Sequence, residues 1–510
     1  MKVFLMYADR DFGAGVELPP NVLDLTKDLA LNTLFEGMAD GDRFLFDVAR
    51  ETVLHSLGSD LATVRYRQEV LKDCLKNHAV VARLYALAGE ALEREKKEVW
   101  KSFFDYPSHR LNRSREALEI FMHVLRQIRA ITDEHAHKFE SAGFSRFFAM
   151  LEDELSDAYF SCVQEHLREL KFHDGVLISA ELGTGNKGKN YILRKIIRPK
   201  AGWIERFFAK KPPSYTLFVH PRDESGARCL SDLRDQGIVL VANALARSTD
   251  HIRSFFVMLR RELAFYLGCT NLHERLRKRG APTCFPVPAP AGEHRLSFEG
   301  LYDACLALTT EQRVVGNDVN ADDRRLVIIT GANRGGKSTF LRSVGLAQLM
   351  MQAGMFAPAE SFRGNLCDGL FTHFKREEDP SMKSGKLDEE LGRMSEIVKH
   401  ITRRSTVLFN ESFAATNERE GSEIASQIIR ALLENDVKIL FVTHLYEFAH
   451  RFCRKEMEAV AFLRAERLPD GTRPFKLIEG APLATSYGED LYDGIFGATR
   501  GTEGTDTAVN

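Results

Sequence analysis

The chain has 510 residues, enough for two or more domains, and its hydrophobic content of 44% and charged content of 28% are those of an ordinary globular protein. The formal net charge of −2 does not exclude a nucleic-acid partner, because a basic patch can lie on a nearly neutral protein. The eight cysteines are scattered and form no CxxC pair, which argues against a disulfide framework or a zinc module and favours a reducing, cytoplasmic location. No apolar stretch approaches membrane-spanning length, so we expect no membrane partner.

Helix-type patterning dominates the first part of the chain. After a short N-terminal segment (residues 1–25), apolar residues recur every three or four positions, as in Val64 to Leu75 and Leu118 to Ile128. The helical pattern covers residues 26–174 and resumes over 226–281. Long helices with short connections predict a core or lever domain that an insertion interrupts.

The interrupting stretch, residues 175–225, has a different character. β-type runs at Val176–Ser179, Tyr191–Leu193 and Tyr215–His220 are separated by turns that contain Gly or Pro. Basic residues gather here, and they suit contact with a phosphate backbone without base reading. A solvated basic face is the alternative. The candidate DNA contacts are Lys187, Lys189, Arg194, Lys195, Arg198 and Lys200.

The C-terminal half predicts an α/β domain. A proline-rich linker is expected at 282–298, the α/β domain at 299–500, and a disordered tail at 501–510. Apolar strands alternating with helices predict a mostly parallel sheet that is covered on both faces. The expected strands are Leu326–Thr330, Thr406–Asn410 and Lys438–Thr443, and the expected helices run from Phe340 to about Ala353 and from Ser422 to Leu433.

The first of these strands runs into Gly331-x-x-x-x-Gly336-Lys337-Ser338, the pattern of a phosphate-binding loop. Glycines there let backbone N–H groups close around phosphates, the lysine reaches the outer phosphates, and the serine hydroxyl can ligate Mg²⁺. The following helix points its positive end at the same anion. We therefore expect nucleotide binding through Gly331, Ala332, Asn333, Arg334, Gly335, Gly336, Lys337, Ser338 and Thr339.

Two later strands end in residues that suit phosphate chemistry. Glu411 follows Asn410 at the end of the second strand, where an acidic residue supplies the Mg²⁺-side carboxylate and orients water. His444 follows the third strand, where a histidine can contact the γ-phosphate or the attacking water. The alternative is that both are ordinary polar strand ends. Because all three strands precede such residues, we favour the catalytic interpretation.

The loop Glu377–Met394 contains Ser384 and Lys386 and lies between the phosphate-loop helix and the acidic strand. Two-subunit ATPases place a loop here that reaches across to the partner's nucleotide. A solvated charged loop is the alternative, and the residues do not decide between the two.

The stretch from Ile328 to His444 resembles the ATPase domain of the MutS mismatch-repair family. Thr330–Thr339 matches the family's Thr-Gly-x-Asn-x-Gly-Gly-Lys-Ser-Thr loop, Asn410–Gly421 is similar to its acidic strand end, and Val442–His444 is similar to its histidine motif. Phe475–Gly480 with Ser486–Gly488 resembles its C-terminal strand and turn. Upstream, the helical layout resembles the family's lever and core, and the β excursion lies where the family inserts its DNA clamp.

The resemblance implies a dimeric, Mg²⁺-dependent ATPase whose grip on DNA follows the state of its nucleotide, in DNA mismatch repair or a recombination-type process. A nucleoid location would follow in a bacterium. The implied roles are phosphate binding by Lys337, Mg²⁺ binding by Ser338, Asn410 and Glu411, water orientation by Glu411, γ-phosphate sensing by His444, packing on adenine by Val314 and Val315, and contact in trans by Ser384 or Lys386.

Several departures from the family pattern limit that transfer. The helical region begins by about residue 25, so we expect no mismatch-wedge domain before it, and the family's C-terminal dimerisation tail looks reduced. Asn410 stands where the family has Asp, which predicts weak Mg²⁺ binding and slow turnover. Leu387 stands where the family has a hydroxyl residue. A nucleotide-gated scaffold without useful hydrolysis is therefore an alternative. Another ABC-type or SMC-like ATPase is a weaker alternative, since it would have a Leu-Ser-Gly-Gly helix start before the acidic strand and the chain has none.

Overall fold

The computed structural model describes the fold of most of the chain as two compact units. Unit 1 contains Met1–Val3, Ala82–Lys138 and Ser145–Arg260, and unit 2 contains Phe4–Val81, Phe139–Phe144 and the chain from Arg261 onward. No helix in the described part of the chain is long and apolar enough to cross a membrane. The described residues are 1–13, 18–99, 106–173, 175–196, 215–376, 385–454 and 459–483.

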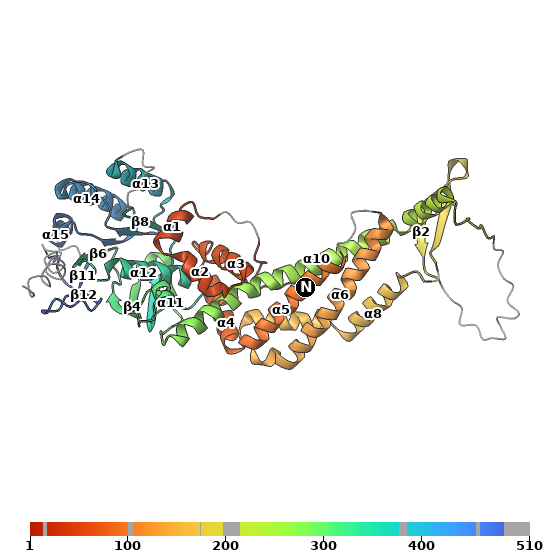
Figure 1. Ribbon diagram of the computed structural model, residues 1–510, viewed down its shortest axis with the longest axis horizontal. Coiled ribbons are helices and arrows are strands. Elements are labelled where there is room, and N and C mark those ends of the chain that lie inside the picture. The colour runs from red at the N-terminus through yellow and green to blue at the C-terminus, as the bar shows by residue number, and fades with distance from the viewer. Residues whose placement is uncertain are drawn as a thin grey trace, which may run out of the picture. The chain divides into compact units, whose positions relative to one another are not determined.

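Unit 1 consists of long helices and one small sheet (Figure 1). Aromatic side chains fill the space between three of the helices, with ring centroids of Phe121 and Phe256 5.2 Å apart and those of Phe147 and Phe255 6.5 Å apart. Pro107 opens a helix at its first turn, where a missing N–H costs no hydrogen bond. The helices are α5 (His78–Arg94), α6 (Pro107–His135), α7 (Ala142–Glu154), α8 (Asp157–Glu169) and α10 (Glu224–Lys278), of which α5, α7 and α10 continue into unit 2.

The β insertion is an antiparallel hairpin of β1 (Leu177–Leu182) and β2 (Gly188–Arg194). It packs on α10, where Ile178 lies so close to Gly237 that a Cβ at this position would be 2.3 Å from the isoleucine Cδ1 atom. The third expected strand, Tyr215–His220, is wrong, because these residues have no regular secondary structure and Tyr215 is 97% exposed. β-propensity reflects packing on a half-buried surface, and the described hairpin offers none to this segment.

Unit 2 contains N-terminal helices as well as the sheets of the α/β domain. The predicted division, which placed these helices in a separate helical domain, therefore differs from the structure. Residues 4–81 belong to the same compact unit as the sheets. The reason is direct contact: the Asn21 side-chain amide donates to the Leu370 carbonyl at 2.7 Å, and Gln352 donates to the Ser56 carbonyl at 3.2 Å. These helices are α1 (Val22–Asp28), α2 (Leu31–Ala39), α3 (Arg43–Leu54), α4 (Leu61–Lys76) and the later α11 (Ala304–Thr309).

The main sheet in the described part of unit 2 has six strands in the order β12-β11-β6-β10-β9-β8. All neighbouring strands are parallel except β11 and β12. The strands expected from the sequence are confirmed to within one residue at each end. The six are β6 (Leu326–Gly331), β8 (Gly369–Phe374), β9 (Ser405–Asn410), β10 (Lys438–Val442), β11 (Val460–Ala465) and β12 (Leu477–Glu479).

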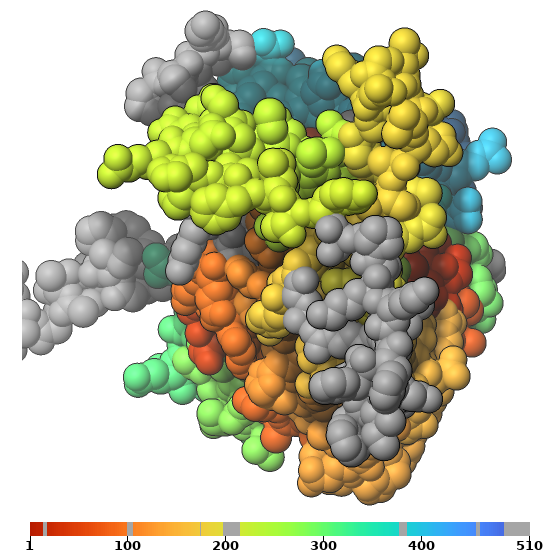
Figure 2. All heavy atoms as spheres, turned by 90° about the vertical axis from the view of Figure 1, so that its right-hand side faces the viewer, coloured from red at the N-terminus to blue at the C-terminus, as the bar shows by residue number. Residues whose placement is uncertain are grey.

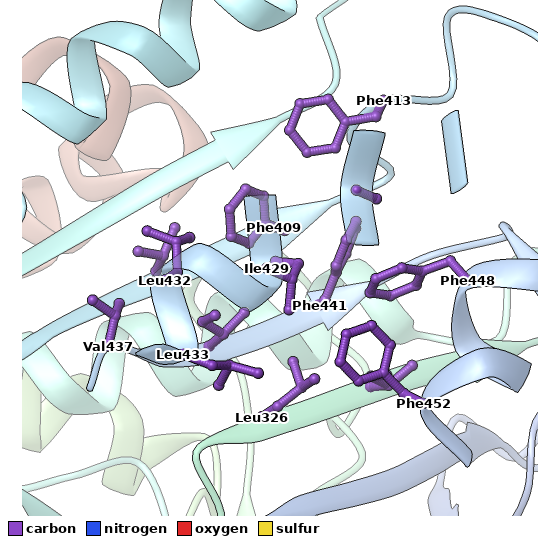
Figure 3. Packing of buried hydrophobic residues seen from close by; sticks show 14 of the residues in the cluster. Leu326, Phe409, Phe413, Ile429, Leu432, Leu433, Val437, Phe441, Phe448 and Phe452 are labelled. Carbon is purple, nitrogen blue, oxygen red and sulfur yellow. The ribbon is translucent and has the colours of Figure 1, made fainter. Parts of the chain in front are cut away.

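Helices cover both faces of this sheet, as expected for buried parallel strands. On one face, α13 (Lys386–His400), α14 (Glu418–Glu434) and α15 (Tyr446–Arg454) enclose an aromatic core that includes Phe409, Phe441 and Phe448 (Figure 3). On the other face lies α12 (Lys337–Gln352), where Gly345 approaches Leu408 closely. The carboxyl ends of the parallel strands therefore share one open edge, the usual place for a ligand in such sheets.

A second sheet occupies part of the expected linker, which is therefore not a free linker. Its order is β3-β7-β4-β5, and β3 pairs in parallel with β7. Pro288 lies in β3, an edge strand, where a residue without an N–H does not interrupt a central ladder. The strands are β3 (Val287–Ala289), β4 (Leu296–Leu301), β5 (Asn317–Asn320) and β7 (Ser361–Asn365).

The N-terminal segment is bound by a buried carboxylate. Glu262 of α10 is fully buried and accepts hydrogen bonds from the backbone N–H groups of Leu5 (2.6 Å), Met6 (3.1 Å) and Phe12 (3.1 Å). Tyr266 donates to the Leu5 carbonyl at 2.7 Å. Burial raises the pKa of Glu262 from 4.5 to about 7, although the three N–H donors act in the opposite direction.

This raised pKa predicts a pH-dependent stability. The folded state binds the Glu262 proton more tightly than the unfolded state, so the contribution is complete below pH 4.5 and is lost as the pH rises through about 7. We expect the free energy of unfolding of wild type to fall by about 3 kcal/mol over this window relative to Glu262→Gln, which cannot ionise. Denaturant unfolding at stepped pH measures this difference, and parallel pH profiles for the two proteins would contradict it.

Candidate functional site

The expected phosphate loop connects β6 to α12 at the open edge of the main sheet. Gly331 (φ 108°), Arg334 (φ 59°) and Gly336 (φ 87°) all have left-handed backbone, and α12 starts directly afterwards at Lys337. A Cβ on Gly335 would lie 2.7 Å from the Ala465 Cβ and 2.9 Å from the Ala332 carbonyl oxygen. The turn therefore needs glycine, and it leaves backbone N–H groups at a helix N-terminus.

A cavity of about 420 Å³ opens beside this loop, a size typical of ligand sites. Gly331 and Ala332 do not line the cavity, but their carbonyl oxygens accept hydrogen bonds from the Lys337 ammonium. Asn410 and His444 are also outside the lining, and each is hydrogen-bonded to a lining residue. The cavity brings together ten of the predicted residues: Val314, Val315, Asn333, Arg334, Gly335, Gly336, Lys337, Ser338, Thr339 and Glu411.

Lys337 is the buried cation of the cavity, only 5% exposed. Its ammonium donates to the carbonyl oxygens of Gly331 at 3.0 Å and Ala332 at 2.9 Å. Burial lowers the pKa of Lys337 to about 8; the Glu411 carboxylate opposes this shift and the nearby charge of Arg473 adds to it. A buried ammonium with a lowered pKa is destabilised without an anion, and phosphate oxygens would supply one.

Ser338 and Asn410 meet across the edge of the sheet, from α12 and β9 respectively. The Ser338 hydroxyl donates to the Asn410 side-chain oxygen at 2.9 Å. Both are oxygen ligands that Mg²⁺ accepts, directly or through water, but the pair carries no charge. Among the described residues that line the cavity, Asp303 and Glu411 have carboxylates. Asp303 is paired with Arg342, so the carboxylate of Glu411 is the one that remains for a cation.

Glu411 pairs with His444, a contact that the sequence did not predict. His444 Nε2 lies 3.0 Å from a Glu411 carboxylate oxygen, and both side chains are about one-third exposed. The hydrogen bond from His444 lowers the pKa of Glu411, and the charges of Lys337 and Lys375 act in the same direction against partial burial. Glu411 is thus held as a carboxylate, the form that can accept a proton from water.

Among the residues in or near the cavity that the sequence analysis did not select are Arg473 and Phe475, in the connection from β11 to β12. Phe475 lines the cavity together with Val314 and Val315, which gives it an apolar part suited to a planar base. Its carbonyl accepts a bond from Asn317 at 3.4 Å. The segment Phe475–Gly480 was noted as similar to a family strand, but nothing in its composition indicated that the chain before it folds back over the phosphate loop.

The predicted contacts outside the cavity are exposed or undescribed. Lys386 is the first residue of α13 and is exposed, whereas Ser384 lies outside the described residues. In unit 1 the hairpin is open to solvent (yellow in Figure 2, beside the yellow-green start of α10). Arg198 and Lys200 also lie outside the described residues. The exposed basic residues of the hairpin region are Lys187, Lys189, Arg194 and Lys195.

Two of these hairpin cations have local acidic partners, which reduces the charge that they offer to a ligand. Lys195 lies 2.7 Å from Glu169, and Lys189 lies 3.8 Å from Glu181. The Arg194 guanidinium donates to the Ser179 hydroxyl at 2.9 Å. Exposed ion pairs of this kind exchange partners at little cost, so the hairpin can still present a basic edge.

Taken together, these residues fit a nucleoside triphosphate with a divalent cation. The glycine turn leaves space that a Cβ would fill. The buried ammonium of Lys337 would be stabilised by an anion. Ser338, Asn410 and Glu411 supply oxygen atoms that can ligate a cation beside that anion. The paired Glu411 and His444 lie where a water could be oriented and deprotonated.

Comparison with known proteins gives matches over two separate stretches. The family model of the MutS2 N-terminal domain matches residues 59–279, and that of MutS domain V matches residues 327–490. The chain is 38% identical over 137 residues to the DNA mismatch repair protein MutS of Thermotoga petrophila and 34% identical over 168 residues to that of Porphyromonas gingivalis. These matches cover 27% and 32% of this chain but only 17% and 18% of the two relatives.

The uncharged Ser338–Asn410 pair predicts a weak cation site that one added charge improves. For Asn410→Asp we expect the Mg²⁺ concentration that half-saturates binding of a fluorescent ATP analogue to fall about tenfold, about 1.4 kcal/mol, because a carboxylate attracts the cation. Asn417→Asp makes the same chemical change at the N-cap of α14, where Asp is tolerated, and should leave the Mg²⁺ dependence unchanged. Equal Mg²⁺ curves for wild type and Asn410→Asp would contradict the assignment.

Proposed function

The chain belongs to the MutS family, and from this premise and the geometry of the cavity we propose that it is a dimeric, ATP-dependent DNA-binding protein with Mg²⁺-dependent ATPase activity. The observation that carries the proposal is the buried Lys337, close enough to Glu411 for their charges to interact, at a turn where glycines leave space that a Cβ would fill. Since the matched stretch covers less than a fifth of the curated relatives, activity, DNA substrate and partners are our inference for this chain.

The residues in and beside the cavity share the tasks of phosphate binding, cation binding and water activation in this proposal. Lys337 and the N–H groups of the loop 331–336 bind phosphate oxygens, while Ser338, Asn410 and Glu411 hold the cation directly or through water. Bound Mg²⁺·ATP supplies the phosphoanhydride and the charge neutralisation for its cleavage. Glu411 orients and deprotonates water, and His444 holds the Glu411 carboxylate and can report on the γ-phosphate.

The base lies in the apolar part of the cavity. Val314, Val315 and Phe475 provide flat or aliphatic contacts there, and Arg473 adds a second positive charge near Lys337. Apolar contact without a dense set of hydrogen-bond donors gives affinity for a purine ring.

We assign DNA contact and dimer contact to residues that do not line the cavity. The hairpin of unit 1 offers Lys187, Lys189, Arg194 and Lys195 to phosphates without base reading, in mismatch repair or a recombination-type process. We assign contact with the partner's nucleotide to the start of α13, with Lys386 as the candidate.

The first test is steady-state ATP hydrolysis by the full chain without DNA and with duplex, mismatched duplex and four-way junction DNA. We expect slow basal turnover, because Asn410 brings no charge to the cation, and an increase of several-fold with at least one DNA. Lys337→Ala serves as the blank, since it removes the buried cation. A rate that no DNA changes, or that does not exceed the blank, would contradict the proposal that DNA and ATP are coupled.

The second test concerns the hairpin. Each phosphate contact adds about −0.9 to the slope of log affinity against log salt for duplex DNA. The double variant Lys187→Ala, Lys189→Ala should therefore reduce the magnitude of this slope by about 1 to 2 in a fluorescence-anisotropy titration. Lys171→Ala removes a charge from the same unit outside the hairpin and is the matched control. An unchanged slope in the double variant would remove the hairpin from the DNA surface.

A nucleotide-gated scaffold is the second candidate, and the uncharged Ser338–Asn410 pair favours it. In that case ATP assembles the dimer without useful hydrolysis. Asn410→Asp separates the two: a large gain in hydrolysis rate indicates that the natural site is adapted to hold ATP, and little change indicates that Glu411 already supports turnover.

A further inference from the structure

The loop that carries Glu411 has an unfavourable backbone conformation. Glu411 (φ 54°) and Phe413 (φ 61°) both lie in the left-handed region, which residues with a Cβ rarely adopt. A Cβ on Gly421 would lie 2.3 Å from the Phe413 carbonyl oxygen, so the start of α14 needs glycine to accommodate this loop. Such a conformation persists only when surrounding contacts hold it, and it commonly marks a functional element.

The contacts that hold the loop come from His373 in β8, a fully buried residue that the sequence analysis did not select. Its Nδ1 lies 2.7 Å from the Ser412 hydroxyl, and its own carbonyl accepts from the same hydroxyl at 2.5 Å. Its ring stacks on Phe413, with centroids 5.2 Å apart and planes 19° apart. Phe413 is itself in the aromatic core beside Phe409 (Figure 3). His373 thus contacts the two residues that follow Glu411.

The other ring nitrogen of His373 reaches a different element. Nε2 lies 3.0 Å from the backbone carbonyl of Glu390 in α13, four residues after Lys386. Burial lowers the pKa of His373 to about 4, so the imidazole is neutral near pH 7 and carries one N–H. A carbonyl can only accept, which places that N–H on Nε2 and leaves Nδ1 as an acceptor. The Ser412 hydroxyl has one proton, which it gives either to Nδ1 or to the backbone carbonyl of His373, so in both cases Ser412 is bonded to His373.

We propose that His373 is a positioning residue that couples the loop of Glu411 to α13, the helix at whose start we place the contact in trans. One imidazole ring spans the two elements, so a displacement of Ser412 on nucleotide binding changes the bond to Glu390 as well. The inference rests on the proposed function, because it assumes that nucleotide binds beside Glu411.

Two features of α13 indicate that the position of its N-terminal turn depends on its bonds to β8. Its other bond to β8 runs from Arg393 to the Phe374 carbonyl at 2.9 Å, so both bonds reach neighbouring residues at the carboxyl end of one strand. In the first turn of α13, Lys386 and Asp388 are exposed and Leu387 and Glu389 are only half-buried, whereas the buried side chains of the helix are Glu390, Met394 and Ile397. Because its N-terminal turn has no buried apolar anchor, the bonds near Glu390 determine where that turn lies.

Two substitutions separate the two bonds of the imidazole. The amide of His373→Gln extends to the position of Nε2 and can still donate to Glu390, whereas the shorter His373→Asn can accept from Ser412 but not reach α13. Ser412→Ala removes the hydroxyl without altering the ring and serves if a histidine variant fails to fold. Each variant is compared with wild type as the full chain.

The measurement is hydrogen–deuterium exchange of α13 peptides with and without Mg²⁺ and a non-hydrolysable ATP analogue, alongside the affinity for that analogue. In wild type we expect the analogue to slow exchange in α13. In all three variants the size of that effect should fall by about two- to tenfold, the range for one lost hydrogen bond, while analogue affinity changes less. In steady state, kcat should fall with little change in KM.

The outcomes distinguish this inference from the proposed function. If wild type binds the analogue and the variants retain the full response of α13, with only a lower melting temperature, His373 is structural and the inference is overturned. A wild-type α13 that does not respond to bound analogue overturns it as well. If wild type does not bind the analogue, the proposed function fails and the inference fails with it.

Discussion

The parallel register of four strands is the constraint on which the site depends. Val442 of β10 pairs with Ile329 of β6 and with Asn410 of β9, and Asn410 in turn pairs with Phe374 of β8. Residues that follow these positions in the chain therefore emerge at one edge of the sheet, although up to 113 positions in the sequence separate the loop that begins at Gly331 from His444. A slip of one residue in any strand would turn its buried side chains to the opposite face and separate Glu411 from Lys337.

The electrostatics of this edge decide the kind of ligand that it suits. Lys337 and Arg473 are close enough to influence each other, and Asp303 in the cavity lining is neutralised by Arg342, so Glu411 is the main acidic group that faces them. A site with two cationic side chains and one main carboxylate attracts a polyanion. Without phosphate oxygens as further ligands, it holds a divalent cation poorly. Among the residues that the structure describes, no group of three or more His, Cys, Asp or Glu side chains could hold a metal ion. The donor set suits a cation that arrives together with phosphate oxygens.

The parts of the fold that were predictable are those with a local cause. The strands β6, β9 and β10 are short apolar runs with polar ends, and the glycine pattern 331–336 specifies its turn directly. What could not be predicted depends on distant partners. Tyr215–His220 has strand-forming residues without a surface to pack on, whereas Pro288 lies in a strand because β7 pairs with it. Phe475 lines the cavity and His373 contacts the loop of Glu411 only because distant segments fold together, and no local pattern at either residue indicates that contact.

The edge strand β8 links the loop of Glu411 to the N-terminal helix α1 of unit 2. Because no further strand pairs with its outer side in the described sheet, α1 occupies that side, with Asn21 bonded to the Leu370 carbonyl.

At the end of the strand, Arg376 forms ion pairs with Asp24 and, at 2.9 Å, with Asp28. His373, three positions earlier, bonds instead to Ser412 and α13. Through His373 in the strand and Arg376 just beyond its last residue, this end of β8 contacts both the loop of Glu411 and α1. A shift of β8 small enough to preserve its ladder with β9 would still alter both sets of contacts, because each depends on hydrogen bonds and ion pairs that weaken steeply with distance and angle.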